Sequence, residues 1–246
     1  MSRNYSKWLR IVTLPAWVFV GFVTASLLAA GFVALLSAVG LSLKGIKPAV
    51  LNFTFAALLY SLTLAIVIGV PWFVKKHRTN MKDLGLGRRL SWNDIITTPF
   101  ALVIYLVFSS LLIFVATNLL PWFDVGQAQE TGFDQLTQDY ELILAFMTLV
   151  AIAPFAEEAL FRGYLYGKLR KSLPIWASIL ITSILFGAVH GAWNVAIDTF
   201  ALSVIMCLLR EKTGSIWASI LLHMLKNGIA FYILFINPVF LTTIGG

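Results

Sequence analysis

The fold of this chain is decided by the stretch LILAFMTLVAIAPFAEEALFRGYLYG, which runs from Leu142 to Gly167. It is long and apolar enough to cross a bilayer, because roughly 20 consecutive apolar residues span the hydrocarbon core as a helix. It nevertheless carries Glu157 and Glu158 side by side, with Arg162 one turn further on. An ionisable side chain at membrane depth costs roughly 2.5–3.5 kcal/mol on insertion scales, so it needs a partner or a function. The stretch therefore predicts a polar chamber inside a helical membrane protein.

The composition of the whole chain predicts the same class. Its 246 residues are 59% hydrophobic and only 12% charged, whereas a soluble domain carries about 25% charged residues. The formal net charge of +7 would suit nucleic acid, but the basic residues fall between apolar stretches, as topology signals do. The single cysteine, Cys207, allows no intrachain disulfide. We expect membrane lipids among the partners and no nucleic acid.

Seven apolar segments can be drawn, and a break at Pro15, Pro71 or Pro238 would add a short eighth. They run from Ile11 to Val39, Val50 to Val74, Ile95 to Leu120, Leu142 to Gly167, Ile175 to His190, Trp193 to Leu209 and Ile216 to Ile236. The first is far longer than the apolar region of a signal peptide, so we expect it to be retained. The sequence predicts an all-α polytopic protein, one domain over 1–246 with seven to eight transmembrane helices. The motif-bearing core covers about 142–238.

The distribution of basic residues predicts the orientation. Lys and Arg gather before the first segment and after the second, fourth and sixth, whereas the loop from Pro121 to Glu141 has five acids and no Lys or Arg. By the positive-inside rule the N-terminus is cytoplasmic, and we expect a multi-pass protein of the plasma membrane. Seven spans would place the C-terminus outside, and eight would place it inside.

The basic stretch from Lys75 to Asn93 is expected to be a cytoplasmic surface loop with some structure. Gly85 and Gly87 interrupt any helix there, and Ser91 can cap the next one. His77, one of three histidines in the chain, falls in this loop, where we expect it to be solvated.

The fourth segment separates its two glutamates by helical geometry. Glu158 and Arg162 are four residues apart, so they share a face and can pair. Glu157 points about 100° away, which leaves its carboxylate available as a general base. The segment therefore predicts one glutamate in a structural role and one that is free for chemistry.

Two further segments each offer polar groups that could meet these glutamates. The fifth segment ends in His190, and the seventh carries His223 and Asn227 four residues apart. Gly187 and Gly191 flank His190 and would permit close helix approach or a break in the helix. We expect the three segments to converge on one chamber.

Each of these polar residues also has a purely structural interpretation. A lone histidine or asparagine in a membrane helix can simply hydrogen-bond to a neighbouring helix, and a Glu–Arg pair can simply join helices. Lys226 is expected to snorkel or to pair with an acid, and Asp198 is expected to be structural. The joint occurrence of the groups favours chemistry more than any one of them does.

Three motifs in order resemble those of the CAAX protease and bacteriocin-processing family, also called the Abi family of intramembrane proteases. They are Glu157-Glu158-x-x-x-Arg162, Phe186-x-x-x-His190 and His223-x-x-x-Asn227. The stretches 213–217 (TGSIW) and 83–86 (DLGL) are also similar to the family. The resemblance covers about 153–230 and departs in the sixth segment, where Ala201 and Ser203 stand in place of frequent glycines.

The resemblance implies an all-helical fold, usually of eight membrane helices, around a chamber that opens towards the cytoplasm. It also implies the roles of individual residues. Glu157 would activate a water with the help of His190, and His223 and Asn227 would stabilise the oxyanion. Glu158, Arg162 and Phe186 would support the site.

The resulting hypothesis is an intramembrane endopeptidase that acts on a membrane-associated or hydrophobic peptide. The resemblance includes processing of lipidated CAAX-type proteins and of bacteriocins or pheromones, and nothing in the chain selects between them. The cofactor stays open between none and Zn²⁺. Glu157, His190 and His223 would be the zinc ligands, but the His-Glu-x-x-His spacing is missing. The resemblance allows a metal-independent glutamate mechanism, which we prefer.

Two alternatives come from other classes of protein. A non-catalytic scaffold or bacteriocin self-immunity protein would keep the fold and bind a membrane-protein partner. A transporter would use the same acids and histidines as a proton relay, but the inverted repeats of many transporters are not visible in this sequence.

Overall fold

The computed structural model describes residues 2–41, 43, 45–75, 79–127, 131–133 and 136–238. His77 lies outside these residues, so its predicted solvation stays a prediction. The described residues form helices and contain no strand, which confirms the all-α class. The elements, with η for π-helical turns, are α1 (Ser2–Ala38), α2 (Pro48–Leu64), η1 (Ala65–Gly69), α3 (Val70–Lys75), α4 (Trp92–Leu119), α5 (Asp139–Phe146), η2 (Met147–Ile152), α6 (Ala153–Glu158), η3 (Ala159–Tyr166), α7 (Gly167–Arg170), α8 (Ile175–Ala188), α9 (Trp193–Thr213), α10 (Trp217–Phe231) and η4 (Tyr232–Ile236).

Several of these elements join into longer rods. α2 continues through η1 into α3, α5 continues through to α7, and α10 continues into η4. Two of the π-helical turns precede a proline, Pro71 or Pro154. A proline has no N–H to offer the carbonyl four residues before it, and the helix widens at such a point instead of ending.

Six rods of the described chain are long and apolar enough to cross a membrane. They are Leu9–Ala38, Pro48–Val74, Trp92–Leu119, Asp139–Arg170, Trp193–Thr213 and Trp217–Ile236. α8 corresponds to the remaining predicted segment, but its 14 residues reach only about 21 Å at 1.5 Å per residue, less than the hydrocarbon core. Pro15 stays inside α1 and Pro71 inside α3, so neither opens an eighth segment.

The outward faces of these rods are apolar, as a surface in contact with lipid requires. Large exposed side chains include Phe19 and Leu27 on α1 and Phe100 and Phe114 on α4. In water, exposed apolar surface on this scale would mark a binding interface or an aggregation hazard. The chain is a multi-pass membrane protein.

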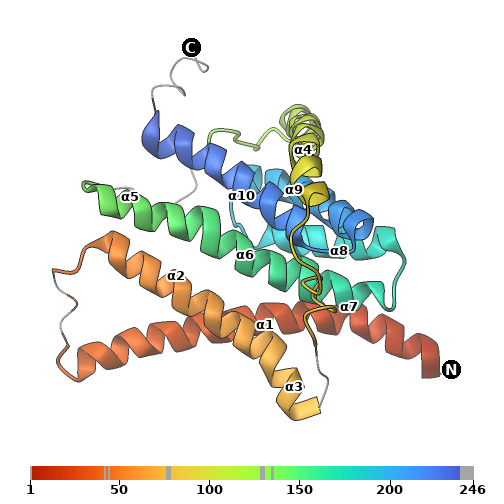
Figure 1. Ribbon diagram of the computed structural model, residues 1–246, viewed down its shortest axis with the longest axis horizontal. Helices are drawn as coiled ribbons and strands as arrows, with labels where there is room; N and C mark the ends of the chain where they lie inside the picture. Colours follow the sequence, from red (N-terminus) through yellow and green to blue (C-terminus); the bar gives the residue numbers. More distant parts are fainter. Residues whose placement is uncertain are drawn as a thin grey trace.

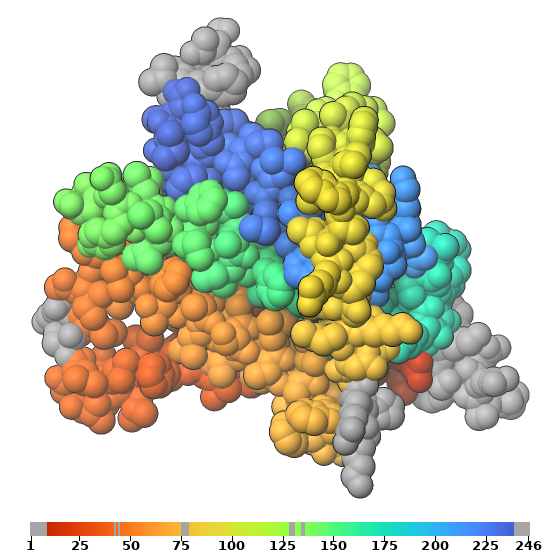
Figure 2. All heavy atoms as spheres, in the orientation of Figure 1, coloured from red at the N-terminus to blue at the C-terminus, as the bar shows by residue number. Residues whose placement is uncertain are grey.

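The rod that begins with α5 lies between α2 and α10 (Figure 1). α4 packs across α9 and α10, and it crosses the face of the molecule seen in Figure 2. The main buried cluster lies where this rod meets α8 and α9, and includes Leu165, Phe186, Leu202 and Met206. The central position of the α5–α7 rod places the glutamate pair among the other helices.

Glycines set the close approach of α8 and α9, as the sequence predicts. A Cβ atom on Gly187 would lie 2.6 Å from the backbone oxygen of Ala196, a separation that real side chains do not reach. Gly191 has φ +79° and lies between the two helices. α8 therefore ends next to His190 and turns sharply into α9.

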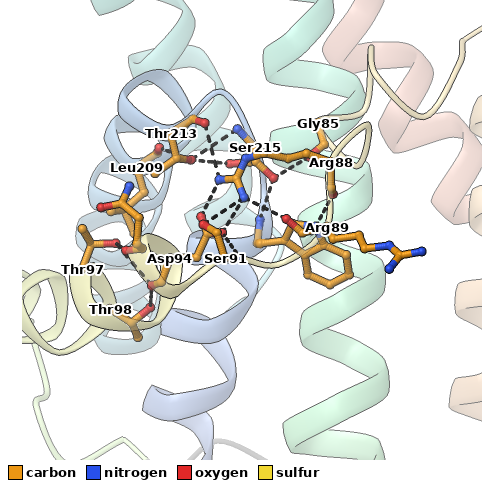
Figure 3. Close-up of polar contacts among 12 residues, drawn as sticks. Gly85, Arg88, Arg89, Ser91, Asp94, Thr97, Thr98, Leu209, Thr213 and Ser215 are labelled. Atoms are coloured by element: carbon orange, nitrogen blue, oxygen red, sulfur yellow. Dashed lines mark hydrogen bonds and ion pairs between the residues drawn. The ribbon is translucent and has the colours of Figure 1, made fainter.

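Hydrogen bonds hold the loop before α4 in a defined conformation, and they confirm the predicted cap at Ser91 (Figure 3). Asp94 accepts hydrogen bonds from the Ser91 backbone N–H at 2.9 Å and from Arg88 at 2.6 Å. The Gly85 carbonyl accepts from the Ser215 hydroxyl at 2.7 Å. The two stretches that resemble the family outside its three motifs, 83–86 and 213–217, are thus in contact.

Candidate active site

Glu158 and Arg162 form the ion pair that their spacing predicts. The Nη1 atom of Arg162 lies 2.9 Å from Oε1 of Glu158, and both side chains are fully buried. The guanidinium also lies 4.2 Å from the ring centroid of Phe186, which is fully buried too. We call Glu158, Arg162 and Phe186 the sealed cluster.

Glu157 turns away from this cluster towards α2. Its Oε1 atom accepts a hydrogen bond from the hydroxyl of Tyr60 at 2.5 Å, and its side chain is 17% exposed. The adjacent glutamates therefore lie in different environments, as the 100° step along a helix predicts. One carboxylate faces a buried guanidinium, and the other faces a phenol and open space.

That open space is a cavity of about 370 Å³. Its walls include Glu157 from α6, His190 from the end of α8, and His223 and Asn227 from α10. The structure thus brings the four predicted catalytic side chains to one cavity. We call Tyr60, Glu157, His190 and Asn227 the cavity cluster.

His223 joins the two clusters. Its Nδ1 atom lies 3.0 Å from Oε1 of Glu158, and its Nε2 atom lies 3.9 Å from Oε2 of Glu157. The side chain is 3% exposed. A single imidazole therefore links the ion pair to the carboxylate in the cavity.

Backbone contacts orient the other two groups. Nδ1–H of His190 donates to the Phe186 carbonyl at 2.7 Å, which in a neutral imidazole leaves Nε2 as an acceptor. Asn227 donates to the Leu149 carbonyl at 2.9 Å. This is the interhelical hydrogen bond of the structural interpretation, and it leaves the second amide hydrogen of Asn227 for another partner.

A second polar group lies further along the same cavity. Lys226 pairs with Asp198 at 3.3 Å, which confirms the expected pairing of Lys226 with an acid. Asp198 also accepts hydrogen bonds from Tyr105 and Ser109 of α4, both at 2.6 Å. The predicted structural role of Asp198 thus has contacts to support it, since it joins α4, α9 and α10.

The predicted zinc set does not fit this arrangement. In the part of the chain that the structure describes, no three His, Cys, Asp or Glu side chains form a group that could hold a metal ion. A catalytic zinc needs three protein ligands around one open position, so we derive no step through a metal.

Tyr60 is the site residue that the motif-based reasoning missed. It lies 97 residues before Glu157 and outside all three motifs. A general signal was present, because a tyrosine hydroxyl inside an apolar segment must find a hydrogen-bond partner. The identity of that partner depends on which helices are neighbours.

Comparison with known proteins identifies the region that carries the motifs. Residues 139–229 match the family of type II CAAX prenyl endopeptidase Rce1-like proteins. An "Uncharacterized 24.3 kDa protein" of Escherichia coli is 33% identical over 89 residues, which are 34% of this chain and 41% of that protein. A "Putative membrane peptidase YdiL" of Bacillus subtilis (strain 168) is 26% identical over 110 residues, 44% of this chain and 45% of that protein.

The matched parts span less than half of the length of either relative. No solved structure matches the chain. The family match nevertheless covers every residue of the three motifs, from Glu157 to Asn227. The match over residues 139–229 therefore confirms the resemblance to the CAAX protease family that the three motifs predict.

Proposed function

We propose that this protein is an intramembrane peptidase that hydrolyses a peptide bond in a membrane-associated or hydrophobic peptide, with water activated by Glu157. The observation that carries the proposal is the common cavity of Glu157, His190, His223 and Asn227. These groups come from three separate helices, and charged groups at membrane depth mark functional sites by default. The family match over residues 139–229 supports the same class of reaction.

In the proposed first step, Glu157 removes a proton from water while the water attacks the peptide carbonyl. Tyr60 donates to Oε1, which leaves Oε2 to receive the proton. The free Nε2 of His190 accepts the other water hydrogen and so orients the attack. General-base catalysis of this kind contributes about 10²–10⁴-fold to the rate.

In the second step, donors on α10 meet the oxyanion of the tetrahedral intermediate. In its imidazolium form, His223 donates Nδ1–H to Glu158 and keeps Nε2–H for the oxyanion. Asn227 contributes its second amide hydrogen. The intermediate then collapses with cleavage of the C–N bond, and Glu157 gives the proton that it took from water to the leaving amine. The Glu158–Arg162 pair fixes the position of His223, and a well-placed oxyanion donor is worth about 10²–10³-fold in rate.

The proposal extends to where the protein acts. The basic residues favour an N-terminus in the cytoplasm and a place in the plasma membrane, and the substrate would reach the cavity from the bilayer or its cytoplasmic surface. CAAX-type lipidated proteins and secreted peptides such as bacteriocins or pheromones are the substrate classes that the family resemblance implies.

Mass spectrometry of membrane peptides tests the proposal. Cells with the wild-type chain are compared with cells that carry Glu157→Gln or, as a matched control, Glu211→Gln, which changes a glutamate paired with Arg170 outside the cavity. We expect a set of peptides that appears with wild type and with the control and disappears with Glu157→Gln. Identical peptide sets in all three would contradict the proposal. A biological effect that survives Glu157→Gln would favour the non-catalytic scaffold or immunity protein.

Metal dependence is tested on the purified protein. Because the donor geometry does not fit a zinc site, we expect activity to persist in EDTA. Loss of activity in EDTA that is restored by Zn²⁺ would contradict the metal-independent mechanism and leave the peptidase function standing.

A further inference from the structure

Lys226 has a position that the proposed mechanism does not use. It follows His223 by three residues on α10 and lines the same cavity. Among the described residues that form the cavity wall, it is the only lysine or arginine. Much of the rest of the wall is apolar, and Glu157 is the only acidic residue among the wall residues that the structure describes. A substrate in the cavity therefore meets one positive and one negative side chain.

The partner of Lys226 is stabilised by other groups as well. Asp198 accepts two hydroxyl hydrogen bonds at 2.6 Å, from Tyr105 and Ser109. Its contact with Lys226 is longer, at 3.3 Å. The ion pairs Glu158–Arg162 and Asp83–Lys171 are closer, at 2.9 and 2.7 Å. Asp198 thus holds the lysine in place without a short hydrogen bond.

The ammonium group of Lys226 keeps donors for a further partner. It carries three N–H groups, and Asp198 is the one acceptor that the described residues provide. Its side chain is 23% exposed, whereas Arg162 is fully buried. A lysine at membrane depth is costly, and one that faces a cavity with unused donors is placed to bind an anion that enters the cavity.

We propose that Lys226, held by Asp198, is a subsite for a carboxylate of the substrate peptide. The inference rests on the proposed peptidase function and adds a substrate class to it, namely peptides with a carboxylate close to the bond that is cut. The carboxylate is either the free end of the peptide or an Asp or Glu side chain. Glu157 repels such a group and Lys226 attracts it, so the subsite also sets the direction in which the peptide lies.

The spacing along α10 limits how far this carboxylate lies from the reacting carbonyl. His223 and Lys226 are separated by three residues, a rise of about 4.5 Å. An extended peptide advances about 3.4 Å per residue. The carboxylate therefore belongs within the first few residues of the scissile bond.

Three matched libraries of hydrophobic ten-residue peptides test the subsite with the full-length protein in lipid nanodiscs. The first has free carboxyl ends and no acidic residues. The second has amidated ends and no acidic residues. The third has amidated ends and one Asp or Glu at each position in turn. Cleavage is followed by mass spectrometry for wild type, Lys226→Met and the control Lys212→Met, an exposed lysine on α9.

For wild type and the control, we expect kcat/KM to be about tenfold higher for at least one of the two carboxylate libraries than for the amidated neutral library. Without a carboxylate, the substrate loses a hydrogen bond to a charged group. Lys226→Met should bring this ratio to about one, mainly through KM. The first and third libraries distinguish a terminal from a side-chain carboxylate. The double variant Lys226→Met with Asp198→Asn removes both charges and should also give a ratio of about one. It controls for misfolding that an unpaired Asp198 could cause in the single variant.

Each of the other outcomes contradicts either the subsite or the peptidase function. Equal cleavage of all three libraries by wild type overturns the subsite and leaves the peptidase function standing. A preference for carboxylate peptides that persists in both Lys226 variants also overturns the subsite and leaves the peptidase function standing. Lys226 would then be a structural link between α9 and α10. No cleavage of any library by wild type counts against the peptidase function and removes the basis of the subsite.

Discussion

The sealed cluster and the cavity cluster each take a glutamate from the same turn of helix, but the two glutamates differ in burial and in hydrogen-bond partners. In the sealed cluster, Glu158 and Arg162 are fully buried and paired. In the cavity cluster, Glu157 is partly exposed, and Tyr60 from another helix donates to one of its oxygens. Neighbouring residues of the same type thus acquire different tasks because a helix turns them 100° apart. The sealed cluster should govern stability, and the cavity cluster should govern activity.

Removal of Arg162 should have the largest effect. Arg162→Met leaves Glu158 buried without its guanidinium partner and with only the contact to His223, and breaking a buried ion pair typically costs about 3–5 kcal/mol. We expect a large fall in unfolding temperature, or no folded protein, with activity lost as a consequence. Thermal unfolding of the purified protein in detergent measures the fall in unfolding temperature. A variant as stable as wild type would show that Glu158 does not depend on Arg162.

Glu157→Gln should have the opposite profile. The amide keeps the size of the side chain and can still accept from Tyr60, so we expect an unfolding temperature close to that of wild type. Peptide hydrolysis should fall about 10²–10⁴-fold, as for loss of a general base. Unfolding temperature and the rate of peptide hydrolysis, measured on one preparation, distinguish loss of activity from loss of stability. If Glu157→Gln lowered stability as much as Arg162→Met, the division between the two clusters would be wrong.

The sequence predicted the features that depend on spacing along one helix. The four-residue separation was enough to pair Glu158 with Arg162 and to send Glu157 elsewhere. The apolar segments with embedded polar groups were enough to predict that His190, His223 and Asn227 lie inside the protein. These predictions held because helical periodicity and the cost of charge in a bilayer act locally.

The features that escaped prediction depend on which helices are neighbours. The partner of Glu157 is Tyr60, 97 residues away, and the partner of Asn227 is a backbone carbonyl 78 residues away. The shortness of α8 was also missed, because the predicted segment included the residues that turn towards α9. Packing between helices decides each of these points, and the spacing of residues along one helix does not specify that packing.

Tyr60→Phe should lower activity less than Glu157→Gln. The variant keeps the ring and removes the hydroxyl that donates to Oε1 of Glu157, a charge-assisted hydrogen bond that orients the carboxylate. We expect kcat to fall about tenfold, the lower end for loss of a hydrogen bond to a charged group, with KM little changed. Tyr232→Phe on η4, where the tyrosine is 53% exposed, is the control. An unchanged kcat would remove Tyr60 from the site.

The smallest effect is expected at an ion pair outside the membrane-spanning rods. The hydrogen bond from Lys171 at 2.7 Å lowers the pKa of Asp83 below its usual range. A carboxyl whose pKa is lowered by folding stabilises the protein above its unfolded pKa, and this contribution is lost as the pH falls through the folded pKa. Because Lys171 is exposed, Lys171→Met should cost at most about 1 kcal/mol at pH 7. Thermal unfolding of wild type and variant at pH 7 and below pH 3 should show a difference that disappears in acid. A loss at pH 7 as large as that of Arg162→Met would contradict the view that burial, more than charge pairing, separates the sealed cluster from the rest of the molecule.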